Sequence, residues 1–102
     1  MSDITSLHSS LVSRILEGEG QASPEIRRAA FDNEGLAEPV GTFVDKVAHG
    51  ARMVTDADIG TLRKAGLSED QIYEIVICAA IGQATRQYQN ALAALSAASG
   101  RK

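Results

Sequence analysis

The feature that most constrains this fold is the stretch of residues 55–95, which holds two helix starts of the same kind and one helix stop. Ser68 is a good helix N-cap, because its hydroxyl accepts a hydrogen bond from a backbone amide in the first turn, and the glutamine three residues later completes a capping box. Thr55 repeats this pattern with an aspartate in the third position. Gly66, between the two starts, is able to adopt the left-handed conformation that ends a helix. We therefore expect one helix between Thr55 and Gly66 and another that begins after Ser68.

The second of these helices carries the most apolar run of the chain. Residues 72–81 contain one charged side chain, Glu74. A short apolar run also suits a buried strand, but the explicit cap, the Ala-Ala pair within it and the length of the pattern favour a helix. Tyr73, Ile77 and Ile81 add a second apolar face, so we expect the first half of the helix to be buried all round. One apolar stripe at helical spacing comprises Ile72, Ile75, Val76, Ala79, Ala80, Tyr88, Ala91, Leu92 and Leu95.

The rest of the chain predicts three more helices and no strand. Residues 3–16 have apolar positions at helical spacing, Ser23-Pro24 is a strong helix start, and Pro39 can begin a third helix whose apolar spacing runs to Ala51. No hairpin turn with alternating flanks is present. With 44% hydrophobic residues, the composition is that of a globular protein. We predict an all-α fold, a single compact helical domain over residues 1–102 of about five helices, with a long C-terminal helix and a frayed tail at 98–102.

The length of the last helix predicts self-association. A helix from Glu69 to about residue 97 is ~43 Å long, whereas a compact domain of this size has a radius of gyration of ~13 Å. One end should therefore project, unless Gly82 breaks or bends the helix. The projecting part carries Tyr88, Leu92 and Leu95, an apolar stripe that monomers rarely leave in water. We expect a homo-oligomer, a dimer or higher, that forms through this helix, with the first helix contributing its own apolar face.

Charge and composition exclude several classes of partner. A net charge of -3 gives no electrostatic reason to bind nucleic acid or an anionic membrane. No apolar run reaches the 18 residues of a membrane-spanning helix. The N-terminal residues lack the basic and apolar regions of a signal peptide, and a single cysteine makes no internal disulfide. We therefore expect a cytoplasmic protein with neither nucleic acid nor membrane among its partners.

Cys78 and Glu74 are two candidates for chemistry in the apolar run. A catalytic cysteine needs a nearby cation, base or helix N-terminus to lower its pKa. Cys78 lies instead in the third turn between apolar neighbours, which indicates a small buried hydrophobe. Glu74 is a candidate general base with a raised pKa, and the alternative is a carboxylate paired with an arginine or placed at the rim.

The two histidines are the remaining candidates. His8 lies on the apolar face of the first helix, which indicates a packing boundary or a contact with another chain, and alternatively a ligand or base. His49 lies opposite the apolar stripe of its helix, so solvent exposure is expected. Neither has a spaced Cys, Asp or Glu partner, and no cofactor-binding motif is present, so we expect no metal and no cofactor. Four basic residues are expected on solvated faces: Arg27, Arg28, Arg63 and Lys64.

Residues 54–72, V-T-D-A-D-I-G-T-L-R-K-A-G-L-S-E-D-Q-I, and the later N-A-L-A-A-L of residues 90–95 resemble the alkylhydroperoxidase AhpD-like superfamily, which includes carboxymuconolactone decarboxylases. The resemblance covers about half of the chain, from near Val44 to Leu95. It implies an all-α fold and oligomeric assembly. The peroxidase chemistry of the family uses a C-x-x-C pair with a following histidine and a nearby glutamate, and this chain has no such pair. No catalytic residue is therefore carried over.

Three functions are compatible with these observations. The first is a non-redox AhpD-like protein that acts as an oligomeric binding or assembly module. The second is a cofactor-free enzyme that resembles carboxymuconolactone decarboxylase and takes a small-molecule ligand between helices or subunits. The third is a thiol peroxidase that uses Cys78 with a resolving thiol from another molecule. A cleft that holds Glu74 or a histidine beside an arginine favours the second, and a dry environment around Cys78 removes the third.

Overall fold

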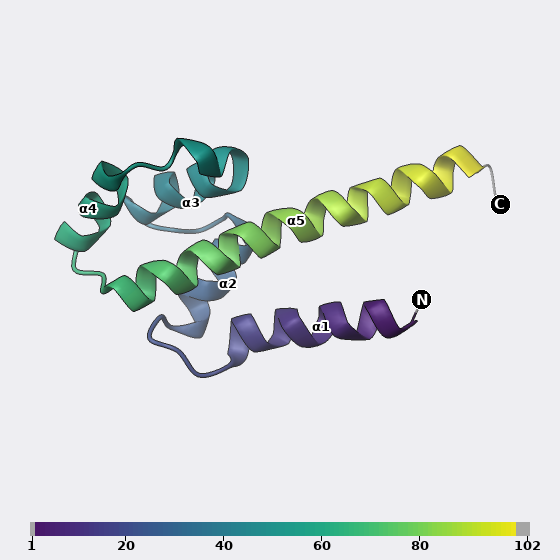
Figure 1. Ribbon diagram of the computed structural model, residues 1–102, viewed down its shortest axis with the longest axis horizontal. Helices are drawn as coiled ribbons and strands as arrows, with labels where there is room; N and C mark the ends of the chain where they lie inside the picture. The colour runs from purple at the N-terminus through teal and green to yellow at the C-terminus, as the bar shows by residue number, and fades with distance from the viewer. Residues whose placement is uncertain (1, 100–102) are drawn as a thin grey trace.

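This computed structural model describes residues 2–99. In this part of the chain the protein consists of helices joined by loops and contains no strand. Figure 1 shows the long C-terminal helix with the other helices arranged along it. The predicted all-α class and the long last helix are confirmed. The elements in chain order are α1 (Ser2–Glu17), α2 (Pro24–Asp32), α3 (Val40–Gly50), the short 3-10 helix η1 (Ala51–Met53), α4 (Asp56–Lys64) and α5 (Glu69–Ser99). The helix α5 extends to Ser99, and residues 100–102 of the expected tail lie outside the described part.

The two helix starts and the helix stop form as their side chains dictate. At the start of α5 the Ser68 hydroxyl accepts from the Gln71 amide at 3.1 Å, and the Gln71 side chain accepts from the Ser68 amide at 2.8 Å. The start of α4 has the same reciprocal pair, so both predicted capping boxes are confirmed. Gly66 ends α4 with a φ of +102°, and the Leu67 amide donates to the Leu62 carbonyl at 3.2 Å. This is the six-residue closure expected of a Schellman ending.

The first half of α5 forms the spine of the core. The helices α2 and α3 make the most extensive contacts with it, and α4 covers its beginning. Leu62, Ile75 and Val44 are among the largest side chains that are fully buried at this junction. One contiguous cluster of buried side chains joins α1, α2, α3, α4 and α5.

Gly82 is a point of close approach between α2 and α5. A Cβ at this position would lie 2.0 Å from the Phe31 carbonyl oxygen at the end of α2. The same carbonyl accepts a hydrogen bond from the Arg86 guanidinium at 2.6 Å. Because α5 continues as one helix through Gly82, the glycine neither breaks nor ends the helix; it admits the backbone of α2.

The expectation that the first half of α5 is buried all round is wrong. Tyr73 is 67% exposed, and Ile77 and Ile81 are only partly buried. The cause is the number of helices available, since α2, α3 and α4 cover one side of this segment and leave the Tyr73 side in solvent. An apolar residue on a second face therefore does not imply a second covering layer.

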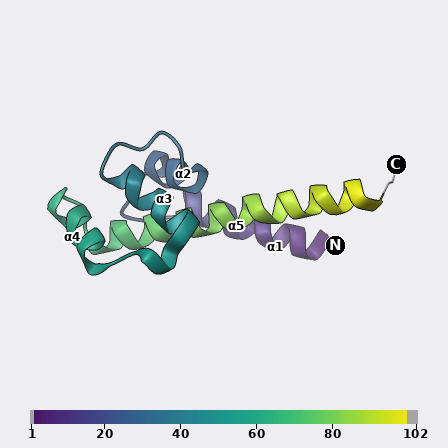
Figure 2. The ribbon, with the colours of Figure 1, turned by 90° about the horizontal axis from the view of Figure 1, so that it is seen from above.

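The C-terminal half of α5 projects from this packed body. The molecule measures 52 × 28 × 21 Å and has a radius of gyration of 15.4 Å, larger than the ~13 Å of a compact chain of this length. Residues 87–98 are exposed along their whole length. Both views show α1 running along α5 in the opposite direction, so that the two termini lie at the same end of the molecule (Figures 1 and 2). No helix within residues 2–99 is long and apolar enough to cross a membrane.

Candidate functional site

A cleft between α1 and the middle of α5 is the main hollow that involves a candidate residue. One hollow of about 520 Å³ lies between the two helices. A second hollow of about 380 Å³ shares four of the same residues and extends to Arg28 and Phe31 of α2. The first is lined by His8, Ser9, Ala84, Thr85, Tyr88, Gln89 and Leu92. Such a mixture of apolar walls and a few polar groups is typical of binding sites.

His8 joins α1 to α5 at the base of this cleft. Its Nε2 atom lies 3.1 Å from the Oγ1 atom of Thr85, a hydroxyl that is almost fully buried. The imidazole also lies beside the Tyr88 ring, with 6.4 Å between the ring centroids. His8 is half-buried, so its expected position at a packing boundary is confirmed. No signal in the sequence marked Thr85 as a partner of His8.

Cys78 lies in the core and has no feature of a reactive thiol. Its side chain is 1% exposed, and its Sγ atom lies 3.6 Å from the Ile15 carbonyl oxygen. Burial raises the pKa of the Cys78 thiol to about 11, against a smaller lowering effect of the nearby Arg27. A thiol with this pKa is protonated at neutral pH, and the thiolate is the form that attacks peroxides. The interpretation as a small buried hydrophobe is confirmed.

Glu74 is partly buried and binds backbone amides, so its alternative placement at the rim fits the structure, whereas amides take the place of the arginine partner. Its two carboxylate oxygens accept hydrogen bonds from the amides of Gln21 and Ala22, at 2.9 Å and 2.7 Å. These two amides belong to the loop between α1 and α2, where they have no acceptor within a helix. The carboxylate therefore fixes that loop to α5, and neither oxygen lies in the cleft that holds His8.

Arg27 is buried, so its expected place on a solvated face is wrong. The side chain is 5% exposed, and its guanidinium donates to the carbonyls of Ala22 at 3.1 Å and Gly18 at 2.7 Å. It also donates to the Ile15 carbonyl at 3.3 Å. The last turn of α1 and the loop after it leave these carbonyls without backbone donors, and a buried carbonyl needs one. We call Arg27 and Glu74 together the loop anchor.

The remaining charged candidates lie on the surface, as expected. His49 is exposed, and its Nδ1 atom lies 3.2 Å from a carboxylate oxygen of Asp45, one turn earlier in α3. Arg28, Arg63 and Lys64 are exposed. Within the described residues, no group of three histidine, cysteine or acidic side chains is placed to hold a metal ion.

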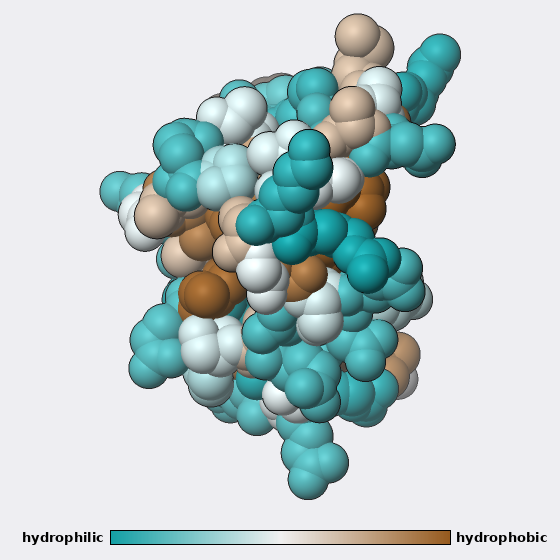
Figure 3. All heavy atoms as spheres, turned by 90° about the vertical axis from the view of Figure 1, so that its left-hand side faces the viewer, coloured by the Kyte–Doolittle hydropathy of each residue, from teal (hydrophilic) through white to brown (hydrophobic). Residues whose placement is uncertain are grey.

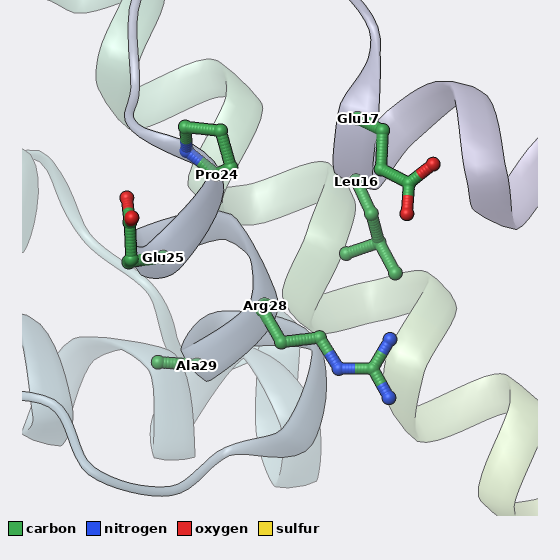
Figure 4. Close-up of a pocket in the computed structure, with 6 residues that line it drawn as sticks. All are labelled: Leu16, Glu17, Pro24, Glu25, Arg28 and Ala29. Carbon is green, nitrogen blue, oxygen red and sulfur yellow. The ribbon is translucent and has the colours of Figure 1, made fainter.

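A further hollow of about 510 Å³ lies where α1 ends and α2 begins. Figure 4 shows Leu16 and Glu17 from α1, with Pro24, Glu25, Arg28 and Ala29 from α2. Its one basic group, Arg28, already pairs with Asp32 at 3.3 Å, one turn along α2. The hollow therefore offers no unpaired basic group to an anionic ligand.

The distribution of charge sets one end of the molecule apart from the rest. No residue from 4 to 13 and none from 87 to 100 is acidic or basic apart from His8, so all charged residues except Asp3, Arg101 and Lys102 lie between Arg14 and Arg86. The opposite end of the molecule, seen in Figure 3, is covered largely by hydrophilic side chains with apolar ones between them. We call residues 6–13 of α1 and 87–98 of α5 the uncharged arms. The charge pattern is visible in the sequence. The fold adds that the two uncharged arms lie at the same end of the molecule.

The uncharged arms also carry much of the exposed apolar surface. Tyr88 is 51% exposed and Leu92 47% exposed, and Leu7 of α1 is 70% exposed.

Comparison of the chain with protein-family models, curated proteins and solved structures finds no match. The uncharged arms and the cleft between them are therefore the candidate site, on the basis of their geometry and charge.

Proposed function

We propose that this protein is a non-redox helical module of the AhpD-like kind, which works by associating with copies of itself through the uncharged arms. The observation that carries the proposal is the exposed half of α5. Residues 87–98 form a helix that is exposed along its whole length and bears no charge. Surfaces of monomers are normally rich in charged side chains, and the centres of protein interfaces are depleted of them.

The physical state of this segment supports the same proposal. Residues 87–98 extend ~18 Å at ~1.5 Å per residue. Most of the stability of a protein helix comes from packing of its apolar face, and this exposed extension has little such packing. Tyr88 and Leu92 present apolar side chains on this segment, and tyrosine is enriched at interfaces. Burial against another chain would stabilise both the helix and these side chains.

The environment of Cys78 argues against a thiol peroxidase. Cys78 is buried and protonated, so the nucleophile that this chemistry requires is missing. Reaction with a peroxide would need the core around the sulfur to open.

One observation favours a second candidate function, a small-molecule enzyme. The hollow of about 380 Å³ is lined by both His8 and Arg28, the combination of a proton carrier and a cation that suits a carboxylate substrate. In the protein as it stands, His8 is bonded to Thr85 and Arg28 is paired with Asp32. A thermal-shift screen with small carboxylates tests this candidate, because a ligand of the native state raises the unfolding temperature. An Arg28→Ala variant that responds as the wild type does would contradict it.

Gel filtration with light scattering tests the main proposal. We expect the wild-type protein to have a mass of two or more chains at micromolar concentration. The variant Leu92→Glu should be a monomer, because association would bury a carboxylate without a partner. The matched control is Tyr73→Glu, which places the same charge at an exposed apolar position of the same helix but outside the arms. This control should keep the wild-type mass.

The two variants separate the possible outcomes. A wild type that is a folded monomer at micromolar concentration refutes the proposed self-association. Dissociation by Tyr73→Glu and not by Leu92→Glu would place the interface on the other side of α5. Circular dichroism on each variant checks that the helices are retained.

A further inference from the structure

We infer that two copies meet with their α5 arms antiparallel, so that α1 and α5 of each copy form a four-helix arrangement around a two-fold axis near residues 91 and 92. This inference rests on the proposed self-association and adds the identity of the contacting residues. It follows from which side of each arm is apolar and from the order of large and small side chains along α5.

The apolar side of the α1 arm is turned away from α2. Val12 and Ser13 line the hollow that reaches Arg28 and Phe31 of α2. An α-helix has 3.6 residues per turn, so Leu7 and Leu11 lie on the other flank of His8 from Val12 and Ser13. Both leucines are exposed on that flank.

The apolar side of the α5 arm is turned the same way. Gln89 lines the hollow that reaches α2, while Tyr88 and Ala84 lie on the opposite flank of Thr85. Figures 1 and 2 show that α1 and α5 run in opposite directions along each other. In two antiparallel helices, the flanks that turn away from α2 lie on one common face. The arms therefore present a two-helix apolar layer with Leu7 and Leu11 on α1 and Tyr88, Leu92 and Leu95 on α5.

The sequence of the α5 arm is complementary to itself when it is reversed. If the two-fold axis passes between residues 91 and 92, Leu92 of each copy lies over Ala91 of the other. In the same register Leu95 lies over Tyr88, at the mouth of the 520 Å³ hollow. Leu92 then faces a small side chain, as in close-packed layers that interdigitate, and Leu95 faces the Tyr88 ring beside an open hollow. The heptad spacing of Thr85, Tyr88, Leu92 and Leu95 is the spacing of helices that pack along their length.

Charge decides in favour of a second copy as the occupant. A partner with a charged surface would bury charges against arms that supply no countercharge, which is costly. Between Arg14 and Arg86 the surface of this chain is rich in charge, so the arms do not match that surface either. The same pair of arms on another copy is an uncharged surface that matches these arms. A two-fold contact joins such identical surfaces.

Single cysteines on the arm test the antiparallel register. The background variant Cys78→Ser keeps a hydroxyl near the Ile15 carbonyl that the thiol faces. In this background, Leu92→Cys should form a dimer through a disulfide when copper–phenanthroline oxidises the two thiols. Ala98→Cys should not, since the antiparallel register places the two copies of residue 98 about 20 Å apart along the helix axis, beyond the reach of a disulfide. Both substitutions are on the exposed arm, so the packed body is unchanged.

A mixture of two variants gives an independent readout. Tyr88→Cys and Leu95→Cys, each in the same background, should form several-fold more disulfide dimer when mixed than either forms alone. Cross-linking of Ala98→Cys as efficient as that of Leu92→Cys, or a mixture no more reactive than its components, overturns the antiparallel arrangement. Light scattering on the same samples separates the two proposals, because a dimer with the wrong cross-linking pattern refutes this inference and a monomeric wild type refutes the proposed function.

Discussion

Gly82→Ala is the substitution for which the structure most clearly predicts whether stability rises or falls. In most helices a glycine-to-alanine change stabilises, because alanine is the better helix former by about 1 kcal/mol. Gly82 lies in the middle of α5, so helix propensity alone predicts a gain of that size. The contact with α2 predicts the opposite.

The steric cost follows from three distances. A Cβ on residue 82 would lie 2.0, 2.7 and 2.8 Å from the carbonyl oxygen, carbonyl carbon and Cα of Phe31, whereas ordinary contacts begin at 3.4 Å. All three are backbone atoms, so no side chain can rotate away, and α2 must retreat from α5. Overpacking of this kind costs typically 1–3 kcal/mol, and about 3 kcal/mol is expected where the obstacle is backbone. The retreat also weakens the bond from Arg86 to the same carbonyl.

The net expectation is a loss of about 2 kcal/mol or more in the free energy of unfolding, after the propensity gain is subtracted. Urea denaturation followed by circular dichroism, at one fixed protein concentration, measures it. The matched control is Gly60→Ala in α4, where nothing lies within 4 Å of the added Cβ. This control should be stabilised by up to about 1 kcal/mol. Equal stability of Gly82→Ala and wild type would refute the close approach of α2 to α5.

Three further predictions concern charged and buried groups. Glu74→Gln should lower the free energy of unfolding in urea by about 1–3 kcal/mol, because two amides of the α1–α2 loop lose a charged acceptor; an unchanged urea midpoint would contradict this role. A backbone hydrogen bond from Thr55, followed by the Lys46 side chain, holds the pKa of Asp58 below its usual value of 3.8, so its contribution is present above about pH 4 and lost as the pH falls. Asp58→Asn should therefore flatten the stability profile in that acid range, and an unaltered profile would show that the capping carboxylate contributes nothing. Because burial raises the pKa of Cys78 to about 11, Ellman's reagent should react with it at pH 8 only after urea unfolds the protein, and rapid reaction in the native state would rule out the buried environment.

The secondary structure could be predicted because its signals are local. Ser68, Thr55 and Gly66 act through bonds to residues within one turn, so their types alone indicated where α4 and α5 begin or end. The all-α class followed from the same signals and from the apolar spacing. The length of α5 was largely local information as well, although Gly82 left open whether the helix would break or bend.

The loop anchor could not be predicted because its bonds join distant parts of the chain. Arg27 is an ordinary basic residue in a short helix until the end of α1 brings three carbonyls around it. Glu74 gains its partners from a loop more than 50 residues earlier. The role of Gly82 was open for the same reason, since the sequence showed a possible kink and the obstacle is the backbone of α2. Fold class followed from the sequence, whereas the supports of the candidate site depend on tertiary contacts.

The loop anchor also explains how α1 can present an arm at all. Leu16, near the end of α1, is buried in the core, Val12 and Ile15 pack against the core, and the part of the helix before Val12 extends beyond it. Arg27 binds the Ile15 and Gly18 carbonyls on either side of that point, and Glu74 holds the following loop against α5. The direction of α1 is therefore fixed at its base by buried hydrogen bonds, and the His8–Thr85 contact holds it further out. Rigid support at the base is what sets Leu7 and Leu11 beside the apolar stripe of α5, so a change in the loop anchor should weaken self-association although it lies outside the uncharged arms.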